Sequence, residues 1–204
     1  MELRTLFELA VPLFLIMDGL GNVPVCMSML RRFPPRRQQR IIFRELCFAL
    51  AISILFCFFG DWLLKFLGLG PSTLRLAGGV VLFVISMRMV FPDESKETAD
   101  PEDPSALAAE EPFIVPIAVP MLAGPSLLAA VMLYATLDSG PVVTALAFTL
   151  AWIPTTIILL LAPWLSRRLG ARGLRAVERL MGLILILLAI QMVEDGVRLF
   201  LDKQ

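Results

Sequence analysis

Histidine is absent from the 204-residue sequence. This absence excludes metal sites built on imidazole and nucleophilic sites of the Ser-His-Asp type, because both need a histidine ring. Cysteine is scarce: Cys26, Cys47 and Cys57 each lie in an apolar stretch, and no two of them form a C-x-x-C pair. We therefore interpret all three as small buried hydrophobic side chains rather than as metal ligands or redox partners.

Charge is also sparse. Charged residues make up 18% of the chain and hydrophobic residues 58%, with a mean hydropathy of +0.82. A water-soluble domain could not hide this excess, so the composition indicates a polytopic membrane protein. No basic stripe with interleaved aromatic residues favours a nucleic-acid partner, and no G-x-x-x-x-G-K-[ST] motif favours direct coupling to ATP. The first residues lack a small-x-small cleavage site, so we expect the first apolar run to be a retained membrane segment.

Six apolar segments are long enough to span a membrane, because crossing about 30 Å of hydrocarbon takes roughly 20 helical residues. They cover residues 6–30, 41–66, 72–91, 112–137, 141–165 and 176–200. The third and sixth have short uncharged cores, so the polar residues beside them must reach the membrane interface. These are Arg75 and Arg88 for the third segment, and Arg179, Glu194 and Asp195 for the sixth. The predicted fold class is all-α, with six transmembrane helices.

Arginine is concentrated in two connections. The first connection contains Arg31, Arg32, Arg36, Arg37, Arg40 and Arg44, and the fifth connection region contains Arg167, Arg168, Arg172, Arg175 and Arg179. Positively charged residues collect on the cytoplasmic side of a membrane. With six spans, the first, third and fifth connections share one side, so the two clusters agree. We predict a multi-pass protein of the inner (plasma) membrane with both termini on the non-cytoplasmic side.

The third connection divides the chain into two halves. Residues 92–111 are acidic, with proline, serine and alanine, and are predicted to form a flexible cytoplasmic linker between residues 1–91 and 112–204. At an offset of 104 residues, Val11 pairs with Val115, Pro12 with Pro116, Met17 with Met121, Arg75 with Arg179, Leu76 with Leu180 and Gly78 with Gly182. Because each half has three spans, the second copy must enter the membrane upside down, as in inverted-repeat transporters.

Helix-breaking residues interrupt the first span and its counterpart, the fourth. The first set is Asp18, Gly19, Gly21, Asn22 and Pro24, and the second is Pro120, Ala123, Gly124, Pro125 and Ser126. Proline removes a backbone donor, and glycine lets the chain leave helical geometry. We therefore predict that the first and fourth helices are broken at mid-membrane. The alternative is that these residues make only a kink or a close helix contact.

Two facing breaks would offer backbone groups to a ligand. Free N–H groups at the start of a half-helix suit a carboxylate, and free carbonyls suit an ammonium group or a cation. Asp18 adds a negative charge, which is costly at depth and usually functional, and Asn22 adds donors and an acceptor. The inventory fits an amino acid with a small side chain. We predict that the ten residues of the two breaks bind the substrate, with Asp18 also the coupling residue.

Other polar residues in the spans have two interpretations. Gln191, Thr155 and Thr156 either line a pathway or form hydrogen bonds to their own helix. Glu194 and Asp195 either mark the outer end of the sixth span or take part in function.

At these motifs the sequence resembles the MarC family of membrane proteins, also called the small neutral amino acid transporter (NAAT) family. The resemblance covers roughly residues 6–200. The family pattern Asp-Pro-x-Gly-Asn-x-Pro reads here from Asp18 to Pro24, with Gly19 in place of the first proline. The pattern Pro-x-x-Ala-Gly-Pro is intact from Pro120 to Pro125, and the runs LRLAGGVVLF and IQMVEDG are also typical of the family.

The resemblance implies a fold like that of the lysine-exporter superfamily, with six spans as two inverted threes. Some members are described as carriers of glycine, alanine and other small neutral amino acids, and most have no established substrate. We therefore expect a secondary transporter of such amino acids that works by alternating access, coupled to protons or Na⁺, with no cofactor and no enzymatic activity. The expected partners are a small neutral amino acid and the lipid bilayer, and the oligomeric state stays open.

Two alternatives remain beside this expectation. The chain could be an exporter or channel for another small solute or ion, or a MarC-family protein of unassigned substrate. A hard-cation path would need several deep carboxylates, and only Asp18 is convincingly deep. An intramembrane aspartyl protease is disfavoured, because GLGN has Asn22 at the position of the catalytic aspartate and no partner aspartate at depth.

Overall fold

The computed structural model describes residues 3–31, 33–91, 123–137 and 140–202, and these ranges contain seven α-helices and no strand. The helices are α1 (Leu3–Met17), α2 (Asn22–Met29), α3 (Pro35–Leu67), α4 (Pro71–Val90), α5 (Pro125–Leu137), α6 (Gly140–Leu160) and α7 (Ala162–Leu201). The predicted all-helical fold class is confirmed. The predicted linker over residues 92–111 lies outside the described residues.

Most of these helices are long and apolar enough to cross a membrane. Four satisfy this condition: α3, α4, α6 and residues 172–201 of α7. The pair α1 and α2 satisfies it together, with a bend of 45° between its two members. Helix α5 is a shorter apolar helix of 13 residues. Because the predicted fourth span begins at residue 112, its first half lies outside the described residues, and the number of six spans stays a prediction.

Helix α3 begins earlier than predicted. It starts at Pro35 rather than near residue 41, with the extended residue Pro34 before it and proline in its first turn, where a missing N–H is harmless. The helix ends at Leu67 and is followed by Gly68, whose φ of +67° places it in the left-handed region that closes helices. The arginines predicted for the connection, Arg36 to Arg44, therefore lie on the first turns of a helix.

The predicted fifth connection is also helical. Helix α7 begins at Ala162, directly after the turn at Leu161, whereas the sixth span was predicted to start at residue 176. The helix is interrupted at Gly170, whose φ of +63° and ψ of 179° are essentially restricted to glycine. Arg167 and Arg168 precede this kink. An arginine-rich stretch thus marks one side of the molecule without forming a loop there.

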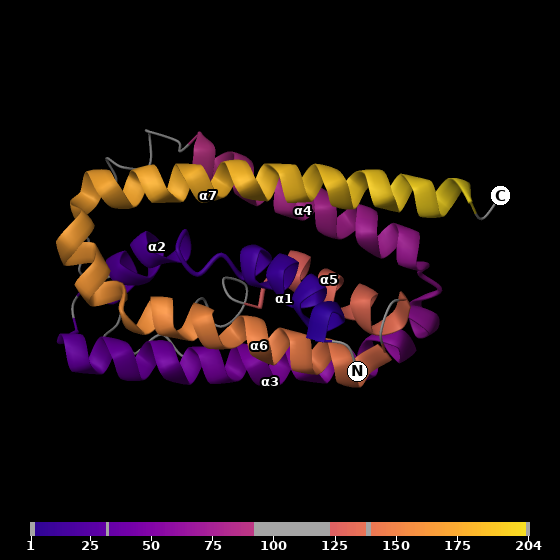
Figure 1. Ribbon diagram of the computed structural model, residues 1–204, viewed down its shortest axis with the longest axis horizontal. Helices are drawn as coiled ribbons and strands as arrows, with labels where there is room; N and C mark the ends of the chain where they lie inside the picture. The colour runs from indigo at the N-terminus through magenta and orange to yellow at the C-terminus, as the bar shows by residue number, and fades with distance from the viewer. Residues whose placement is uncertain (1–2, 32, 92–122, 138–139, 203–204) are drawn as a thin grey trace, which may run out of the picture.

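The helices form three layers (Figure 1). Helices α3 and α6 make one outer layer, α4 and α7 make the other, and α1, α2 and α5 lie between them. The contacts agree: α4 packs most extensively on α7, α1 packs on α6, and α5 packs on both α3 and α4. The helices that carry the two predicted breaks are therefore at the centre of the molecule.

Glycines let α4 and α7 approach closely. A Cβ added to Gly79 would lie 3.0 Å from the carbonyl oxygen of Ala189, and one added to Gly182 would lie 3.1 Å from that of Ser86. The two helices run in opposite directions (Figure 1). Small residues at such contacts are the usual means of packing helices in a membrane, where the hydrophobic effect does not drive association.

The two ends of the molecule differ in composition. The start of α3 and the turn between α6 and α7 lie at one end, which we call the arginine-rich end because it carries Arg36 to Arg44 and Arg167 to Arg175 (Figure 1). Both chain termini lie toward the opposite end.

The cysteines are only partly as predicted. Cys26 and Cys57 are buried, but Cys47 is exposed on the outer face of α3. The prediction of burial is wrong for Cys47, because an apolar side chain in a membrane span can face lipid as readily as protein.

Candidate functional site

The motif DGLGN breaks the first span. Residues Asp18 to Gly21 form a turn between α1 and α2, and Asp18 has a φ of +44°, the only positive value among the described non-glycine residues. Its N–H donates to the carbonyl of Leu15 at 3.0 Å, and its own carbonyl accepts from the N–H of Asn22 at 3.0 Å. The predicted break in the first helix is confirmed.

Polar side chains of the motif satisfy the backbone at this break. The Oδ1 atom of Asp18 accepts a hydrogen bond from the N–H of Gly21 at 3.0 Å, and the Nδ2 atom of Asn22 donates to the carbonyl of Met17 at 3.1 Å. Such local bonds replace helix bonds that the break removes, and backbone groups in a membrane must be satisfied internally. Two of the backbone groups predicted to face a ligand are therefore already occupied.

The two glycines of the turn are required by close contacts. A Cβ added to Gly21 would collide with the Asp18 carboxylate and the terminal methyl group of Met89 on α4. A Cβ added to Gly19 would lie 3.0 Å from Cγ2 of Thr155 on α6 and 3.4 Å from its Cα. The turn thus lies between α4 and α6: a larger residue at Gly21 would displace the Asp18 carboxylate and the end of the Met89 side chain, and one at Gly19 would press on Thr155.

The surroundings of Asp18 come from three helices. Its side chain is only 5% exposed. Thr155 of α6 and Met89 of α4 border the turn, and Glu178 of α7 is close enough to Asp18 for a Coulombic interaction. The hydroxyl of Thr155 donates to the carbonyl of Ala151 at 3.0 Å. Thr155 therefore bonds to its own helix, as one of the two interpretations held, and also borders the turn; that it lines a pathway stays a prediction.

Thr156 differs from its neighbour. Its hydroxyl oxygen is buried, and it has no hydrogen-bond partner within the described part of the chain. Sequence reasoning gave Thr155 and Thr156 the same two interpretations, and only their positions on α6 separate them.

The first break is not halfway along the neighbouring helices. Gly19 lies beside Thr155, five residues before the end of α6 at Leu160, and Gly21 lies beside Met89, one residue before the end of α4. The two legs are unequal as well, with 15 residues in α1 and 8 in α2. The break therefore lies beside the last turn of α4 and midway between the centre and the end of α6. Its position at mid-membrane stays a prediction.

The second break is described in part. Helix α5 begins at Pro125, Ala123 is 1% exposed, and the carbonyl of Gly124 accepts from the N–H of Leu128 at 3.0 Å. Ser126 is also buried, at 5% exposure. The predicted site residue Pro120 lies outside the described residues.

Helix α5 packs against α1, and the residues just before α5 share a buried cluster with α2. Leu127 shares a buried apolar cluster with Met17 of α1, and Ala123 shares a second cluster with Val23 and Cys26 of α2. The polar residues of the two breaks, however, contact different positions along α4.

Each break contacts α4, and the two contacts lie at different positions along that helix. A Cβ on Gly78 would be 3.9 Å from the Ser126 carbonyl, whereas Gly21 faces Met89. These two positions on α4 are eleven residues apart, roughly 16 Å of helix. The turn of the first break thus meets the end of a side chain from the last turn of α4, whereas the Ser126 carbonyl lies beside the first half of that helix.

A small cavity lies between the broken helices and the α4–α7 pair. Its volume is about 70 Å³. It is lined by Pro12, Ile16, Arg75, Ala130, Leu133, Tyr134, Leu188, Gln191, Met192 and Asp195. One end is at Ile16, two residues before Asp18, and the other is at an ion pair in which Nη1 of Arg75 lies 3.4 Å from Oδ2 of Asp195. Sequence reasoning left Gln191 and Asp195 open, and it interpreted Arg75 as the end of a span and as the repeat counterpart of Arg179.

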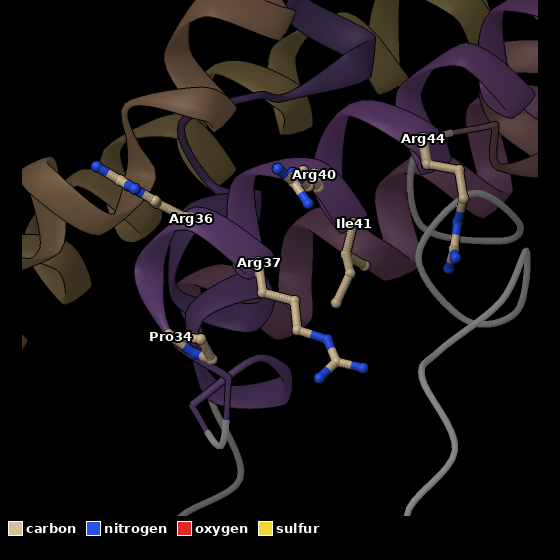
Figure 2. A pocket seen from close by; sticks show the side chains of 6 residues that line it. All are labelled: Pro34, Arg36, Arg37, Arg40, Ile41 and Arg44. Atoms are coloured by element: carbon tan, nitrogen blue, oxygen red, sulfur yellow. The ribbon is translucent and has the colours of Figure 1, made fainter.

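A wider hollow lies at the arginine-rich end. Its volume is about 550 Å³, and Arg36, Arg37, Arg40 and Arg44 of α3 line it together with Pro34 and Ile41. Figure 2 shows that all of these side chains come from the start of one helix. The guanidinium of Arg37 lies 5.2 Å from the centre of the Phe33 ring, a cation–π contact.

A comparison with models of protein families shows to which family this chain belongs. The profile described as "MarC family integral membrane protein" matches residues 3–201. The chain belongs to the MarC family. It is therefore an integral membrane protein, as its composition indicates.

Curated relatives of this MarC chain come from bacteria and archaea. It is 43% identical over 202 residues to the UPF0056 inner membrane protein YhgN of Escherichia coli (strain K12), covering 98% of this chain and 99% of the relative. It is 41% identical over 198 residues to a UPF0056 membrane protein of Buchnera aphidicola subsp. Baizongia pistaciae, covering 96% and 98% of the two chains. A Pyrococcus abyssi UPF0056 membrane protein is 33% identical over 196 residues, covering 96% of each. No solved structure matches the MarC chain.

Proposed function

We propose that this MarC-family protein is a secondary transporter of small neutral amino acids, similar in size to glycine and alanine, and that it works by alternating access. The observation that carries the proposal is the bent pair α1 and α2, with the buried carboxylate of Asp18 at the bend. Discontinuous helices with polar groups at the break form substrate and ion sites in many secondary transporters. A buried ionisable residue in a membrane span is most often functional.

The chemistry of the break supports a small substrate and a coupling ion. Gly19 and Gly21 leave almost no space beside Thr155 and Met89, so only a small ligand could approach the turn. Asp18 would carry a proton, or would hold Na⁺ together with backbone carbonyls of the turn. Rotation of the Asp18 and Asn22 side chains away from the turn would free the N–H of Gly21 and the carbonyl of Met17 for a ligand.

Two inverted halves form part of this proposal. Under the proposed topology, α4 and α7 are the third helices of the two halves. They approach each other through Gly79 and Gly182, each against a backbone carbonyl of the other helix. At this offset α5 corresponds to α2, and the contact of α2 with α7 is matched by that of α5 with α4, as exchange of the halves requires. These paired contacts support the repeat that the 104-residue offset predicts.

The proposed orientation places the arginine-rich end in the cytoplasm and both termini on the opposite side. The concentration of guanidinium groups around the hollow in Figure 2 supports it, because positively charged residues collect on the cytoplasmic side. The Escherichia coli relative is named an inner membrane protein. We place this protein in the corresponding membrane.

Uptake of labelled glycine and alanine into proteoliposomes tests the proposal. The purified full-length chain is reconstituted, and a pH or Na⁺ gradient is imposed across the vesicle membrane. We expect accumulation that depends on one of the two gradients and that collapses when this gradient is dissipated. Failure of both amino acids to accumulate under either gradient would contradict coupled transport.

A matched pair of variants connects the result to the break. Asp18→Asn removes the buried carboxylate, and Asp61→Asn removes an exposed one that pairs with Lys65 at 2.6 Å near the end of α3. We expect uptake to be lost in the first variant and retained in the second.

A further inference from the structure

We propose that Arg75 and Asp195 form a recognition site for the two charged ends of a zwitterionic amino acid, at the outer end of the cavity between α1, α4, α5 and α7. This inference rests on the proposed transport function and assigns it a second site, separate from the turn at Asp18. The carboxylate of the ligand would bind the Arg75 guanidinium, and its ammonium group would bind Asp195.

The first argument is the position of the ion pair. Arg75 is four residues inside the start of α4, about 6 Å of helix, and Asp195 is six residues inside the end of α7, about 9 Å. Their side chains are only 17% and 35% exposed. Removing two such charges from water is costly, so a pair at this depth is weak evidence for a purely stabilising role.

The second argument is that α4 and α7 do not need this ion pair to meet. The sequence neighbours of the two charges, Leu76 and Gly196, already pack tightly against each other. A Cβ added to Gly196 would be 2.8 Å from Cγ of Leu76 and 3.1 Å from its backbone nitrogen. Farther along the same helix pair, Gly79 and Gly182 make the further close contacts described above. Close packing between α4 and α7 is therefore present at the ion pair's sequence neighbours and farther along the helix pair.

The third argument is the geometry of the pair. The Nη1–Oδ2 distance of 3.4 Å is longer than the 2.8 Å between Arg4 and Glu8 or the 2.6 Å between Lys65 and Asp61. A guanidinium has five N–H donors and a carboxylate has about four lone-pair positions, so one loose contact leaves capacity on both groups. A ligand with one charge of each sign can use this capacity without leaving either side chain unpaired.

The cavity itself fits the size of such a ligand. One water needs about 10–15 Å³ of this kind of volume, so the 70 Å³ between the helices exceeds the needs of a single water. Ala130, Leu133 and Ile16 line the space with apolar side chains, and Gln191 adds an amide. The apolar part suits a hydrogen or methyl side chain and excludes a long or charged one.

Binding at this site would connect recognition to movement. A bound zwitterion replaces the direct contact between Arg75 and Asp195 with one contact to each. The charge link between α4 and α7 is then carried by the ligand, at a cavity that is also lined by Ile16, two residues before Asp18 in α1. The ion pair thus recognises the ligand at a site separate from the break.

Binding of labelled glycine to the purified full-length protein in detergent tests the proposal. The variants are Arg75→Gln, Asp195→Asn and the double variant, with Lys65→Gln as a matched control in an exposed ion pair at the same end of the molecule. We expect each single variant to weaken glycine binding at least tenfold, the double variant to be no better than either, and Lys65→Gln to bind as the wild type does.

Competition by glycinamide adds a readout that a structural role would not change. Glycinamide lacks the carboxylate, so it should compete poorly for the wild type and as well as glycine for Arg75→Gln. Arg75→Lys keeps the charge but not the bidentate geometry. We expect this variant to fold and to bind glycine more weakly than the wild type while still preferring it to glycinamide.

Two results would overturn the proposal. If the pair only braces α4 and α7, the single variants would suffer from an unpaired charge, and the double variant would recover both thermal stability and glycine binding. If the single variants bound glycine as tightly as the wild type does, the ion pair would likewise have no part in recognising the ligand. If the wild type itself bound neither glycine nor alanine, both this inference and the transport function would fail, whereas binding by the double variant would refute this inference alone.

Discussion

Asp18 adopts a backbone conformation that few side chains tolerate. Its φ of +44° lies in the left-handed region, where glycine, asparagine and aspartate are the usual residues. The side chain also caps the turn through its hydrogen bond to Gly21. Its structural role therefore needs only a short side chain with an acceptor oxygen, whereas the proposed coupling role needs the negative charge.

Two variants of Asp18 separate these roles. Asp18→Asn keeps the acceptor oxygen and the tolerance of a positive φ, so we expect thermal unfolding close to that of the wild type and no gradient-driven uptake. Asp18→Ala loses the cap as well, which should lower the free energy of unfolding by about 1–2 kcal/mol. Uptake by Asp18→Asn at the wild-type rate would show that the charge has no part in transport.

At the scale of residues, the sequence predicted the members of the break but not their partners. Asp18, Asn22 and the glycines are evident because polar and helix-breaking residues interrupt an apolar run. The neighbours of the turn, Met89 and Thr155, are dozens of residues away in the chain, and no local pattern connects them to it. The hydrogen bonds within the turn were also missed, because they depend on the side-chain geometry of the bend.

Helix α7 shows how one residue shapes a whole element. Its 40 residues are continuous except at Gly170, where φ is +63° and ψ is 179°. A Cβ added there would meet nothing within 4 Å. The requirement for glycine is therefore conformational and not steric. The kink lets the chain leave α6, turn at the arginine-rich end and run back along α4 (Figure 1).

Substitution at the kink tests this conformational requirement. Gly170→Ala should lower the free energy of unfolding by about 1–3 kcal/mol, because an L-residue rarely adopts this φ and ψ. The control is Gly173→Ala in the same helix, where an added Cβ would meet only the Leu169 side chain, at 3.0 Å. Alanine favours helix by about 1 kcal/mol over glycine, so this control should not be destabilised. Equal thermal stability of the two variants would contradict the assignment of the kink.

The boundaries of elements were predictable only where glycine or proline marked them. The end of α3 and the start of α4 are within two residues of their predicted positions, beside Gly68 and Pro71. The starts of α3 and α7 were missed, because arginine-rich stretches were assigned to connections. Arginine is a good helix former, so such a stretch indicates the side of a membrane and not the absence of a helix.

The whole molecule is a three-layer arrangement with its broken helices inside. The outer layers, α3 with α6 and α4 with α7, enclose α1, α2 and α5 (Figure 1). All-helical architecture followed from composition, but the layers did not, because apolar side chains in a membrane face lipid and protein alike. The arrangement accounts for the burial of Asp18 in a chain whose surface is largely apolar.

Accessibility of single cysteines tests the orientation of the whole molecule. In a variant without Cys26, Cys47 and Cys57, one cysteine is placed in the segment 36–40 or in the segment 138–140. A membrane-impermeant maleimide added to intact cells should label segment 138–140 and should leave segment 36–40 unlabelled until the membrane is opened. Labelling of segment 36–40 in intact cells would reverse the proposed orientation.

Counterflow of glycine is the most direct test of the central claim, that this MarC-family protein is a carrier for small neutral amino acids. Proteoliposomes loaded with unlabelled glycine are diluted into a trace of labelled glycine, with no ion gradient imposed. A carrier predicts that the label rises transiently above its equilibrium level inside the vesicles and then declines. A simple rise to equilibrium, equal to that in vesicles without protein or typical of an open channel, would contradict the account.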